Sequence, residues 1–291
     1  MVDALYPFQS RFFEHLGLRL HYLDEGAGDP VVMLHGNPTW SFYYRRLVEA
    51  LRTSHRVIAP DHIGCGLSDK PDDGHYDYTL ARRVEDLDAL LEWLGVEKNV
   101  TLVLHDWGGM IGMTWACRHP ERIARIVVLN TAAFPMPAAK RMPVSLSLCR
   151  GPLGALFVRG LNLFCTGALV RCVARHRLSK AERERYLRPY DSWRNRIAVH
   201  RFIQDIPLRS SDRSFGVVRD VAERLETFRA TPLLILWGMR DFVFDAHFLA
   251  EWERRFPDAR VHRFEDAGHY VLEDAFDEIR PLVEEFLRPA P

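Results

Sequence analysis

The sequence lacks the features that mark several classes of protein. Its 39 Lys and Arg residues balance 39 Asp and Glu residues, and without a basic excess nucleic-acid binding is not expected. Five cysteines form neither a CxxC pair nor a Cys/His cluster with metal-ligand spacing, so we expect reduced thiols in a cytoplasmic protein. No phosphate-binding loop, repeat or low-complexity tract is present. We therefore expect neither a metal nor a cofactor.

Long apolar runs that could enter a membrane are also scarce. Residues 1–17 contain no uninterrupted apolar stretch of the kind found in signal peptides. Residues 151–170 are apolar enough to be considered as a membrane span, but Arg159 and Asn162 lie near the middle of this segment. Because a charged side chain is costly at the centre of a bilayer, we expect two short apolar helices here and no integral membrane span.

The chain does contain a regular alternation of apolar strands and amphipathic helices. Continuous apolar runs between turn residues are typical of strands that are buried on both faces of a sheet. The predicted strands are residues 18–23, 31–34, 56–59, 100–104, 126–129, 233–237 and 260–264. Helical patterns such as the one over residues 80–94 separate them, and 291 residues suffice for one such domain with an insertion. The pattern predicts an α/β fold with a mostly parallel, doubly wound sheet.

This alternation has one long interruption. Helical pieces that are rich in arginine and broken by prolines occupy residues 134–214, and the strand pattern resumes at Pro232. We predict a main domain of residues 1–133 and 215–291 and a helical cap (lid) of residues 134–214. Ligands of open α/β sheets bind beyond the carboxyl ends of the strands, so a cap inserted between two strands is well placed to cover a ligand.

The candidate catalytic residues follow three of the predicted strands. Asp106, Asp241 and His269 come in the chain order nucleophile, acid, histidine that α/β-hydrolases use. Asp106 lies in the stretch LHDWGG, where two glycines permit the sharp turn of a nucleophile elbow, although Leu104 departs from the leading glycine of the G-x-S-x-G pattern. Each residue alone could be a helix cap, a turn residue or a buried histidine. Their joint placement predicts a catalytic triad.

An aspartate nucleophile indicates a particular chemistry. A carboxylate attacks without first losing a proton, so it can displace a leaving group at saturated carbon or open a strained ring, forming a covalent ester. In the usual second step His269, oriented by Asp241, activates water against the ester. Asn37 in the loop HGNPTW and the indole N–H of Trp107 can donate hydrogen bonds to the departing anion. The alternative to this role is that Asn37 is an ordinary polar loop residue and Trp107 only packs in the core.

The motifs HGNPTW, PDHIGCGLSDKP, HDWGG, WGMRDF and DAGHY resemble the haloalkane dehalogenase branch of the α/β-hydrolase superfamily across nearly the whole chain. The combination of Asn37, Trp107 and Asp241 is similar to one dehalogenase subfamily. Another subfamily has a glutamate after the sixth strand, where Asn130 stands here. The resemblance therefore implies Asp241 as the acid of the triad.

Epoxide hydrolases resemble this chain in their aspartate nucleophile. Their HGxP loop carries an aromatic residue, and their lid supplies two tyrosines. Asn37 in the loop disfavours this assignment, while Tyr186 and Tyr190 in the predicted cap leave it open.

A narrower resemblance comes from strings that include cap segments, namely VVLNTAAFPMP, YDSW, QDIPL and RDFVFDAHFL. These are similar to the β-lactone decarboxylases of bacterial long-chain olefin biosynthesis. The resemblance implies conversion of a cis-3-alkyl-4-alkyloxetan-2-one to a cis-alkene and carbon dioxide. It leaves room for a multienzyme assembly with the other olefin-pathway enzymes. Haloalkane hydrolysis through an alkyl-enzyme ester is the alternative function.

The lactone chemistry fits the candidate residues in two ways. Asp106 could attack the ring carbon that bears the ring oxygen, with Asn37 and Trp107 holding the departing carboxylate, or it could attack the carbonyl and form a mixed anhydride. Neither route needs His269 to activate water, so its role in a lyase is open. Apolar cap residues could line tunnels for a hydrophobic substrate or merely pack the cap onto the main domain: Leu153, Leu156, Phe157, Val158, Leu161, Leu163 and Phe164.

Overall fold

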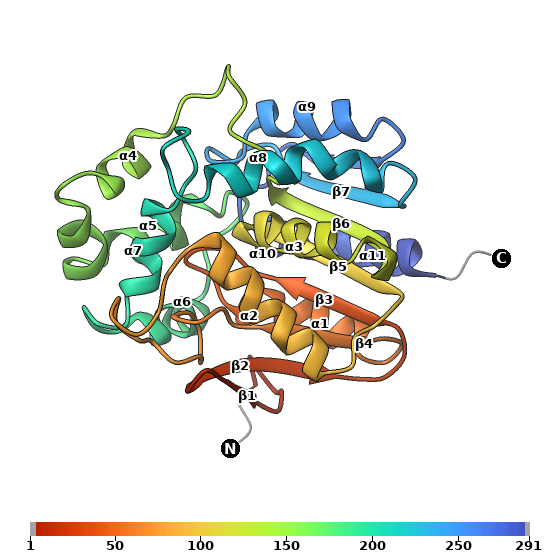
Figure 1. The fold of residues 1–291 in the computed structure, drawn as a ribbon, viewed down its shortest axis with the longest axis horizontal. Helices are drawn as coiled ribbons and strands as arrows, with labels where there is room; N and C mark the ends of the chain where they lie inside the picture. Colours follow the sequence, from red (N-terminus) through yellow and green to blue (C-terminus); the bar gives the residue numbers. More distant parts are fainter. Residues whose placement is uncertain (1–3, 289–291) are drawn as a thin grey trace.

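An eight-stranded sheet forms the centre of the structure, a computed structural model that describes residues 4–288 (Figure 1). The strand order is β1-β2-β4-β3-β5-β6-β7-β8. The first two strands are antiparallel to their neighbours, and all later pairs are parallel. The strands are β1 (Arg11–His15), β2 (Leu18–Glu25), β3 (Pro30–Leu34), β4 (Arg56–Pro60), β5 (Val100–Asp106), β6 (Ile123–Thr131), β7 (Leu233–Gly238) and β8 (Arg260–Phe264).

Helices cover both faces of this sheet (Figure 1). Along β3, Val32 and Leu34 join the core beneath α2, α3, α8 and α9, while Val31 and Met33 join the core beneath α1, α10 and α11. The two buried faces explain why such strands are apolar at every position. These helices and 3-10 turns are α1 (Arg45–Leu51), α2 (Leu80–Trp93), α3 (Trp107–Arg118), α8 (Phe215–Arg224), α9 (Ala246–Arg255), α10 (Val271–Asp274), α11 (Phe276–Leu287), η1 (Ser41–Tyr44), η2 (Pro120–Arg122) and η5 (Leu225–Phe228).

The predicted α/β fold with a mostly parallel, doubly wound sheet is confirmed, and all seven predicted strands are present. The sequence prediction missed β1. This edge strand buries only Phe13 of its five residues, so it has no apolar run for a pattern search to detect. It forms because β2 offers it a ladder of backbone partners.

The segment between β6 and α8 consists of short helices beyond the carboxyl ends of the strands (Figure 1, green to teal). Asn162, in the left-handed conformation with φ of 54°, separates η3 from α5 and breaks the apolar stretch of residues 151–170. Among residues 4–288, no helix is both long and apolar enough to cross a membrane. The elements of this segment are α4 (Val144–Arg150), the π-helical turn η3 (Leu156–Gly160), α5 (Leu163–Arg171), α6 (Lys180–Leu187), η4 (Arg188–Tyr190) and α7 (Ile197–Gln204).

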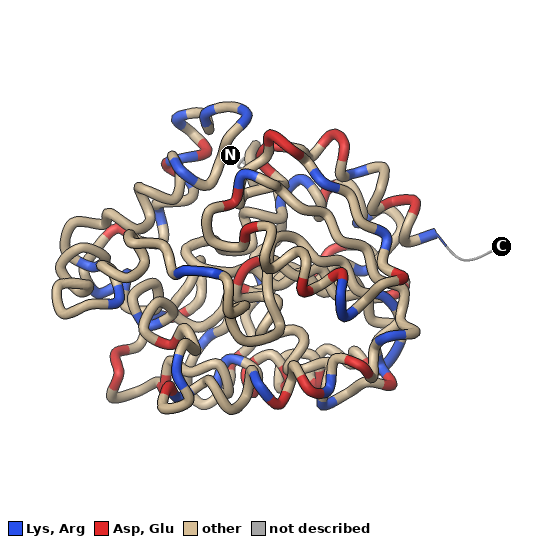
Figure 2. Tube along the Cα trace, turned by 90° about the horizontal axis from the view of Figure 1, so that it is seen from above, with Lys and Arg blue, Asp and Glu red and all other residues tan. Residues whose placement is uncertain are grey.

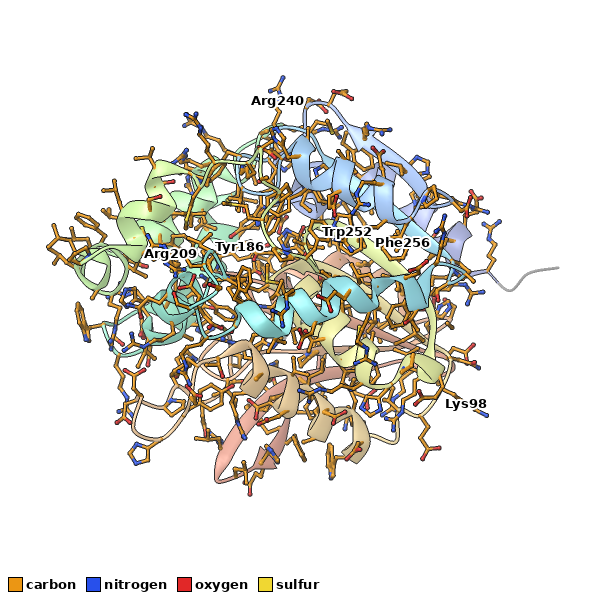
Figure 3. All side chains as sticks on the ribbon, turned by 45° about the horizontal axis from the view of Figure 1, so that its top comes forward. Lys98, Tyr186, Arg209, Arg240, Trp252 and Phe256 are labelled. Carbon is orange, nitrogen blue, oxygen red and sulfur yellow. The ribbon has the colours of Figure 1, made fainter. Side chains whose placement is uncertain are left out.

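A buried polar cluster ties this segment to the main domain. Arg45 of α1 donates to Glu273 of α10 over 2.9 Å and to Glu182 of α6 over 2.8 Å. The hydroxyl of Tyr186, also on α6, donates to Glu273. Figure 3 shows Tyr186 within the body of the molecule. Because removing one partner would leave the others buried and unpaired, the cluster fixes α6 against the main domain.

Candidate active site

Asp106 lies on a sharp turn between β5 and α3. Its backbone has φ of 51° and ψ of −126°, a strained conformation for a residue with a Cβ. A Cβ on Gly108 would overlap the carbonyl oxygen of Leu34, and a Cβ on Gly36 would overlap the side chain of Asp106. Glycine at these two positions therefore lets the helix and the HGNP loop approach the strand closely, and the turn presents the Asp106 carboxylate above the sheet.

The structure brings the three predicted triad residues together. His269 Nε2 is 3.1 Å from Asp106 Oδ2, and His269 Nδ1 is 2.6 Å from Asp241 Oδ2. Asp106 ends β5, the loops after β7 and β8 supply Asp241 and His269, and all three side chains are buried. The geometry is that of a nucleophile, a histidine and an orienting acid.

Asp241 is held by more than the histidine. Its Oδ1 accepts hydrogen bonds from the backbone N–H groups of Val243 at 2.7 Å and Phe244 at 3.1 Å. Its Oδ2 also accepts from Asn130 Nδ2 at 3.1 Å. The sequence prediction treated Asn130 only as the place where a glutamate is missing. A polar residue at the carboxyl end of β6, at the same edge of the sheet as the triad, was the signal that could have identified this positioning residue.

His105 is a second positioning residue that the sequence prediction missed. Its Nε2–H donates to the backbone carbonyl of His269 over 2.9 Å, and the two imidazole rings lie 4.6 Å apart. Burial and the neighbouring His269 lower the pKa of His105 well below 6.5. His105 is therefore a neutral donor that fixes the backbone of His269.

His269 is positively charged in the resting site. Burial disfavours its charged form, but the carboxylates of Asp241 and Asp106 outweigh burial and raise the pKa of His269 to about 10. At neutral pH the imidazolium therefore donates to both carboxylates. His269 can become a neutral base only after one of these negative charges is lost, for example when Asp106 forms an ester.

Donors for an anion surround Asp106. The backbone N–H of Trp107 donates to Asp106 Oδ1, which leaves Oδ2 as the oxygen nearer to His269. Asn37 Nδ2 donates to the backbone carbonyl of Val199, on α7, over 3.0 Å. Because an amide nitrogen carries two N–H groups, one remains for a ligand. The ring of Trp107 packs at 5.2 Å from Phe202 of the same helix, so α7 positions both donors.

A cavity of about 340 Å³ lies above these residues. Asn37, Asp106, Trp107 and His269 form its polar end, whereas the rest of the lining is largely apolar. The volume lies within the range of small-molecule sites. The apolar lining comes from both parts of the chain and includes Met110, Met136, Leu146, Leu148, Phe157, Leu163, Phe164, Ile203, Ile206, Phe242, Phe244 and Phe248.

The seven apolar residues of the predicted cap fall into three groups: some line the cavity, one is buried away from it, and the others are exposed to solvent. Phe157, Leu163 and Phe164 do line the cavity. Val158 is fully buried without lining it. The remaining three, which are Leu153, Leu156 and Leu161, are 49–59% exposed to solvent. Which side of η3 faces the cavity is decided by how this turn packs against the rest of the chain, and an apolar run in the sequence does not show it.

Neither cap tyrosine points into the cavity. Tyr186 donates to Glu273, and the hydroxyl of Tyr190 donates to the carbonyl of Thr39 over 3.1 Å. Both hydroxyl groups are therefore occupied in joining the segment between β6 and α8 to other parts of the chain. The arrangement argues against the epoxide hydrolase alternative, which needs two tyrosines that face the ligand.

The chain is similar to known proteins over most of its length. The profile of the alpha/beta hydrolase fold family matches residues 29–276. The cis-3-alkyl-4-alkyloxetan-2-one decarboxylase of Shewanella oneidensis is 54% identical to this chain, over 99% of this chain and 91% of that protein. The corresponding protein of Xanthomonas campestris pv. campestris is 48% identical over 94% of each chain.

Haloalkane dehalogenases are more distant. Haloalkane dehalogenase 2 of Mycobacterium tuberculosis is 30% identical over 96% of this chain and 95% of its own length. Among solved structures, the haloalkane dehalogenase DatA from Agrobacterium tumefaciens C58 is similar with a TM-score of 0.85 and 27% identity, over 96% of each chain.

Proposed function

Since the chain belongs to the α/β-hydrolase fold family, and within it to the group of cis-3-alkyl-4-alkyloxetan-2-one decarboxylases, we infer that it is a carbon–carbon lyase that converts a cis-dialkyl β-lactone to a cis-alkene and carbon dioxide. The observation that carries this inference is the 54% and 48% identity to two such decarboxylases over nearly the full chain, against 30% to a dehalogenase. The apolar cavity supports a substrate with alkyl chains.

In the first proposed step Asp106 attacks the ring carbon that bears the ring oxygen. The carbon–oxygen bond breaks with inversion, and the ring oxygen leaves as a carboxylate. Asn37 and Trp107 hold this anion, for which a free amide N–H and an indole N–H are suitable donors. The strain of the four-membered ring drives the opening, and the product is an ester on Asp106.

In the second proposed step the bond between the new carboxylate and its carbon breaks. Its electron pair forms the alkene, carbon dioxide departs, and the Asp106 carboxylate is released as the leaving group. Inversion followed by anti elimination gives the cis-alkene from the cis-lactone. The two steps consume no water, so His269 need not act as a base.

His269 has an electrostatic role in this scheme. The carboxylate formed from the lactone supplies a new negative charge to the cavity when Asp106 loses its own, so the imidazolium keeps an anion to pair with. The pKa of about 10 supports a histidine that stays protonated. Asp241 orients the ring through its 2.6 Å contact with Nδ1.

A rival route has Asp106 attack the carbonyl carbon to form a mixed anhydride. Rapid quenching of the reaction into neutral hydroxylamine separates the two routes, because an anhydride is converted to a hydroxamate much faster than an alkyl ester. A hydroxamate of Asp106 would favour carbonyl attack, whereas a hydroxamate of the substrate acid also forms directly from unreacted lactone and is not counted.

The function itself is tested by supplying a long-chain cis-β-lactone and, separately, a 1-haloalkane. We expect alkene and carbon dioxide from the first and little halide from the second. Asp106→Ala should abolish either activity. Asp266→Asn removes a surface carboxylate that pairs with Arg175, and this control variant should keep the activity of the unsubstituted protein. Halide release without alkene would identify a dehalogenase. In that case His269→Ala should accumulate an alkyl ester on Asp106, visible as added mass.

Two further features are proposed from the resemblance alone. These are a cytoplasmic location and a multienzyme assembly with the other enzymes of olefin biosynthesis. Size-exclusion chromatography of the chain mixed with those enzymes tests the second, and elution as separate species would contradict it.

A further inference from the structure

The surface of α4, η3 and α5 exposes an unusual concentration of aliphatic side chains. Of the twelve large apolar side chains that residues 4–288 expose, seven lie between residues 144 and 170. Their exposed fractions run from 49% to 75%. Scattered apolar residues on a surface are ordinary, whereas a gathered patch indicates a partner or a membrane. These residues, here called the cap face, are Val144, Leu148, Leu153, Leu156, Leu161, Leu163 and Val170.

The cap face and the lining of the active-site cavity share two residues. Leu148 is 56% exposed and Leu163 is 51% exposed, and yet both also line the cavity. They therefore form part of its mouth, with one side toward solvent and the other toward the substrate. A partner or membrane that covers the cap face therefore adjoins the apolar lining of the cavity above Asp106.

The cap face is set in a purely basic part of the chain. Residues 134–181 contain eight Lys and Arg residues and no Asp or Glu, in a chain whose overall charge is zero. Several of these cations pair with carboxylates of other segments. Arg141, Arg171 and Arg177 are exposed and have no carboxylate partner within residues 4–288. Figure 2 shows the end of the molecule away from the C-terminus as mostly tan, with blue segments and some red ones.

An aromatic and a cation lie together beside η3. Trp193 is 48% exposed, and the guanidinium of Arg159 lies 4.6 Å from the centre of its ring. A tryptophan beside an arginine at the rim of an aliphatic patch is typical of the boundary between lipid headgroups and acyl chains.

We propose that the cap face docks on the surface of an anionic phospholipid bilayer, with the mouth of the cavity against the lipid. Aliphatic side chains enter the acyl boundary while exposed arginines contact the headgroups, which is how interfacial proteins bind without spanning a membrane. This inference rests on the proposed function, because a lactone with two alkyl chains partitions into lipid and can enter the cavity without crossing water. A protein partner would be expected to meet more aromatic and fewer aliphatic side chains.

Vesicle flotation tests the docking without any use of activity. The full chain is mixed with vesicles of phosphatidylcholine, with or without phosphatidylglycerol, at low and high salt. We expect binding that requires phosphatidylglycerol and weakens with salt. The triple variant Leu153→Ser, Leu156→Ser, Leu161→Ser should bind roughly tenfold more weakly or worse. Arg141→Gln and Arg177→Gln should each weaken binding about fivefold.

The controls separate docking from folding and from catalysis. Leu16→Ser with Leu67→Ser removes exposed leucines elsewhere (71% and 38% exposed) and should leave vesicle binding unchanged. None of the substituted residues lines the cavity, so turnover of a short-chain, water-soluble β-lactone should persist in every variant. Turnover of a long-chain lactone supplied in vesicles should fall in the triple variant. It should stay unchanged in the control with Leu16→Ser and Leu67→Ser.

Failure of docking and failure of the proposed function are distinguishable. Absence of vesicle binding, or equal binding by wild type and triple variant, overturns the docking proposal even if the lactone is decarboxylated. Binding to an acidic protein of the pathway that the triple variant loses, without binding to vesicles, also overturns it and assigns the cap face to that protein.

Discussion

The contact between His269 and Asp241 predicts a stability difference that depends on pH. In Asp241→Asn the amide cannot present an oxygen both to the Val243 and Phe244 N–H groups and to His269, so one interaction is lost. The rise of the His269 pKa from 6.5 to about 10 corresponds to a preference for the imidazolium on the order of 5 kcal/mol. Asp241 is the largest contributor to that rise. We therefore expect the variant to lose a few kcal/mol of stability at neutral pH.

The sign of the pH dependence follows from the raised pKa. A group with a raised folded-state pKa stabilises the fold fully below its unfolded pKa, and this contribution disappears as the pH rises through the folded value. The difference in unfolding free energy between wild type and Asp241→Asn should therefore be largest below pH 6.5 and close as the pH approaches 10. Urea denaturation of both proteins at a series of pH values measures this difference in unfolding free energy.

The control for this experiment is Asp266→Asn. This substitution removes the same charge three residues before His269, from a carboxylate that is 55% exposed and pairs with Arg175. Its stability should differ little from wild type at any pH. A constant difference between wild type and Asp241→Asn from pH 6.5 to 10 would refute the assignment of a raised pKa to His269.

Two further substitutions test other parts of the site. Asn37→Ala and Trp107→Phe each remove one donor to the departing anion. We expect kcat on the lactone to fall about 10²–10³-fold with little change in KM. A rise in KM at unchanged kcat would show that the donor serves only substrate binding. Tyr186→Phe breaks the hydrogen bond to Glu273 and should cost about 1–3 kcal/mol in urea denaturation at unchanged kcat, whereas a large loss of kcat would contradict its placement outside the cavity.

Much of the fold was predictable because its signals are local. The strands that are buried on both faces, such as β3 and β5, are apolar at successive positions, and the elbow at Asp106 is marked by its own glycines. The edge strand β1 was not predictable, since its pairing with β2 and not its own hydrophobicity makes it a strand.

The candidate site was predictable for a related reason. In a parallel sheet the residue that follows each strand lies at one shared edge, so Asp106, Asp241 and His269 could be grouped before any distance was known. The supporting residues could not. His105 contacts the carbonyl of His269, and Asn130 contacts Asp241. Both contacts exist only once β5, β6, β7 and β8 lie side by side.

The sequence by itself determined the chemical identity of the site: a carboxylate on a tight turn, an acid and a histidine after later strands, and donors beside the nucleophile. Tertiary structure alone decided how that chemistry is held and reached. The carbonyl of Val199 on α7 orients the amide of Asn37, and two nearby carboxylates keep His269 charged. The packing of η3 against the rest of the chain puts Phe157 in the cavity lining and leaves Leu156 half exposed. These outcomes depend on contacts between residues far apart in the chain, and periodicity within one segment carries no information about them.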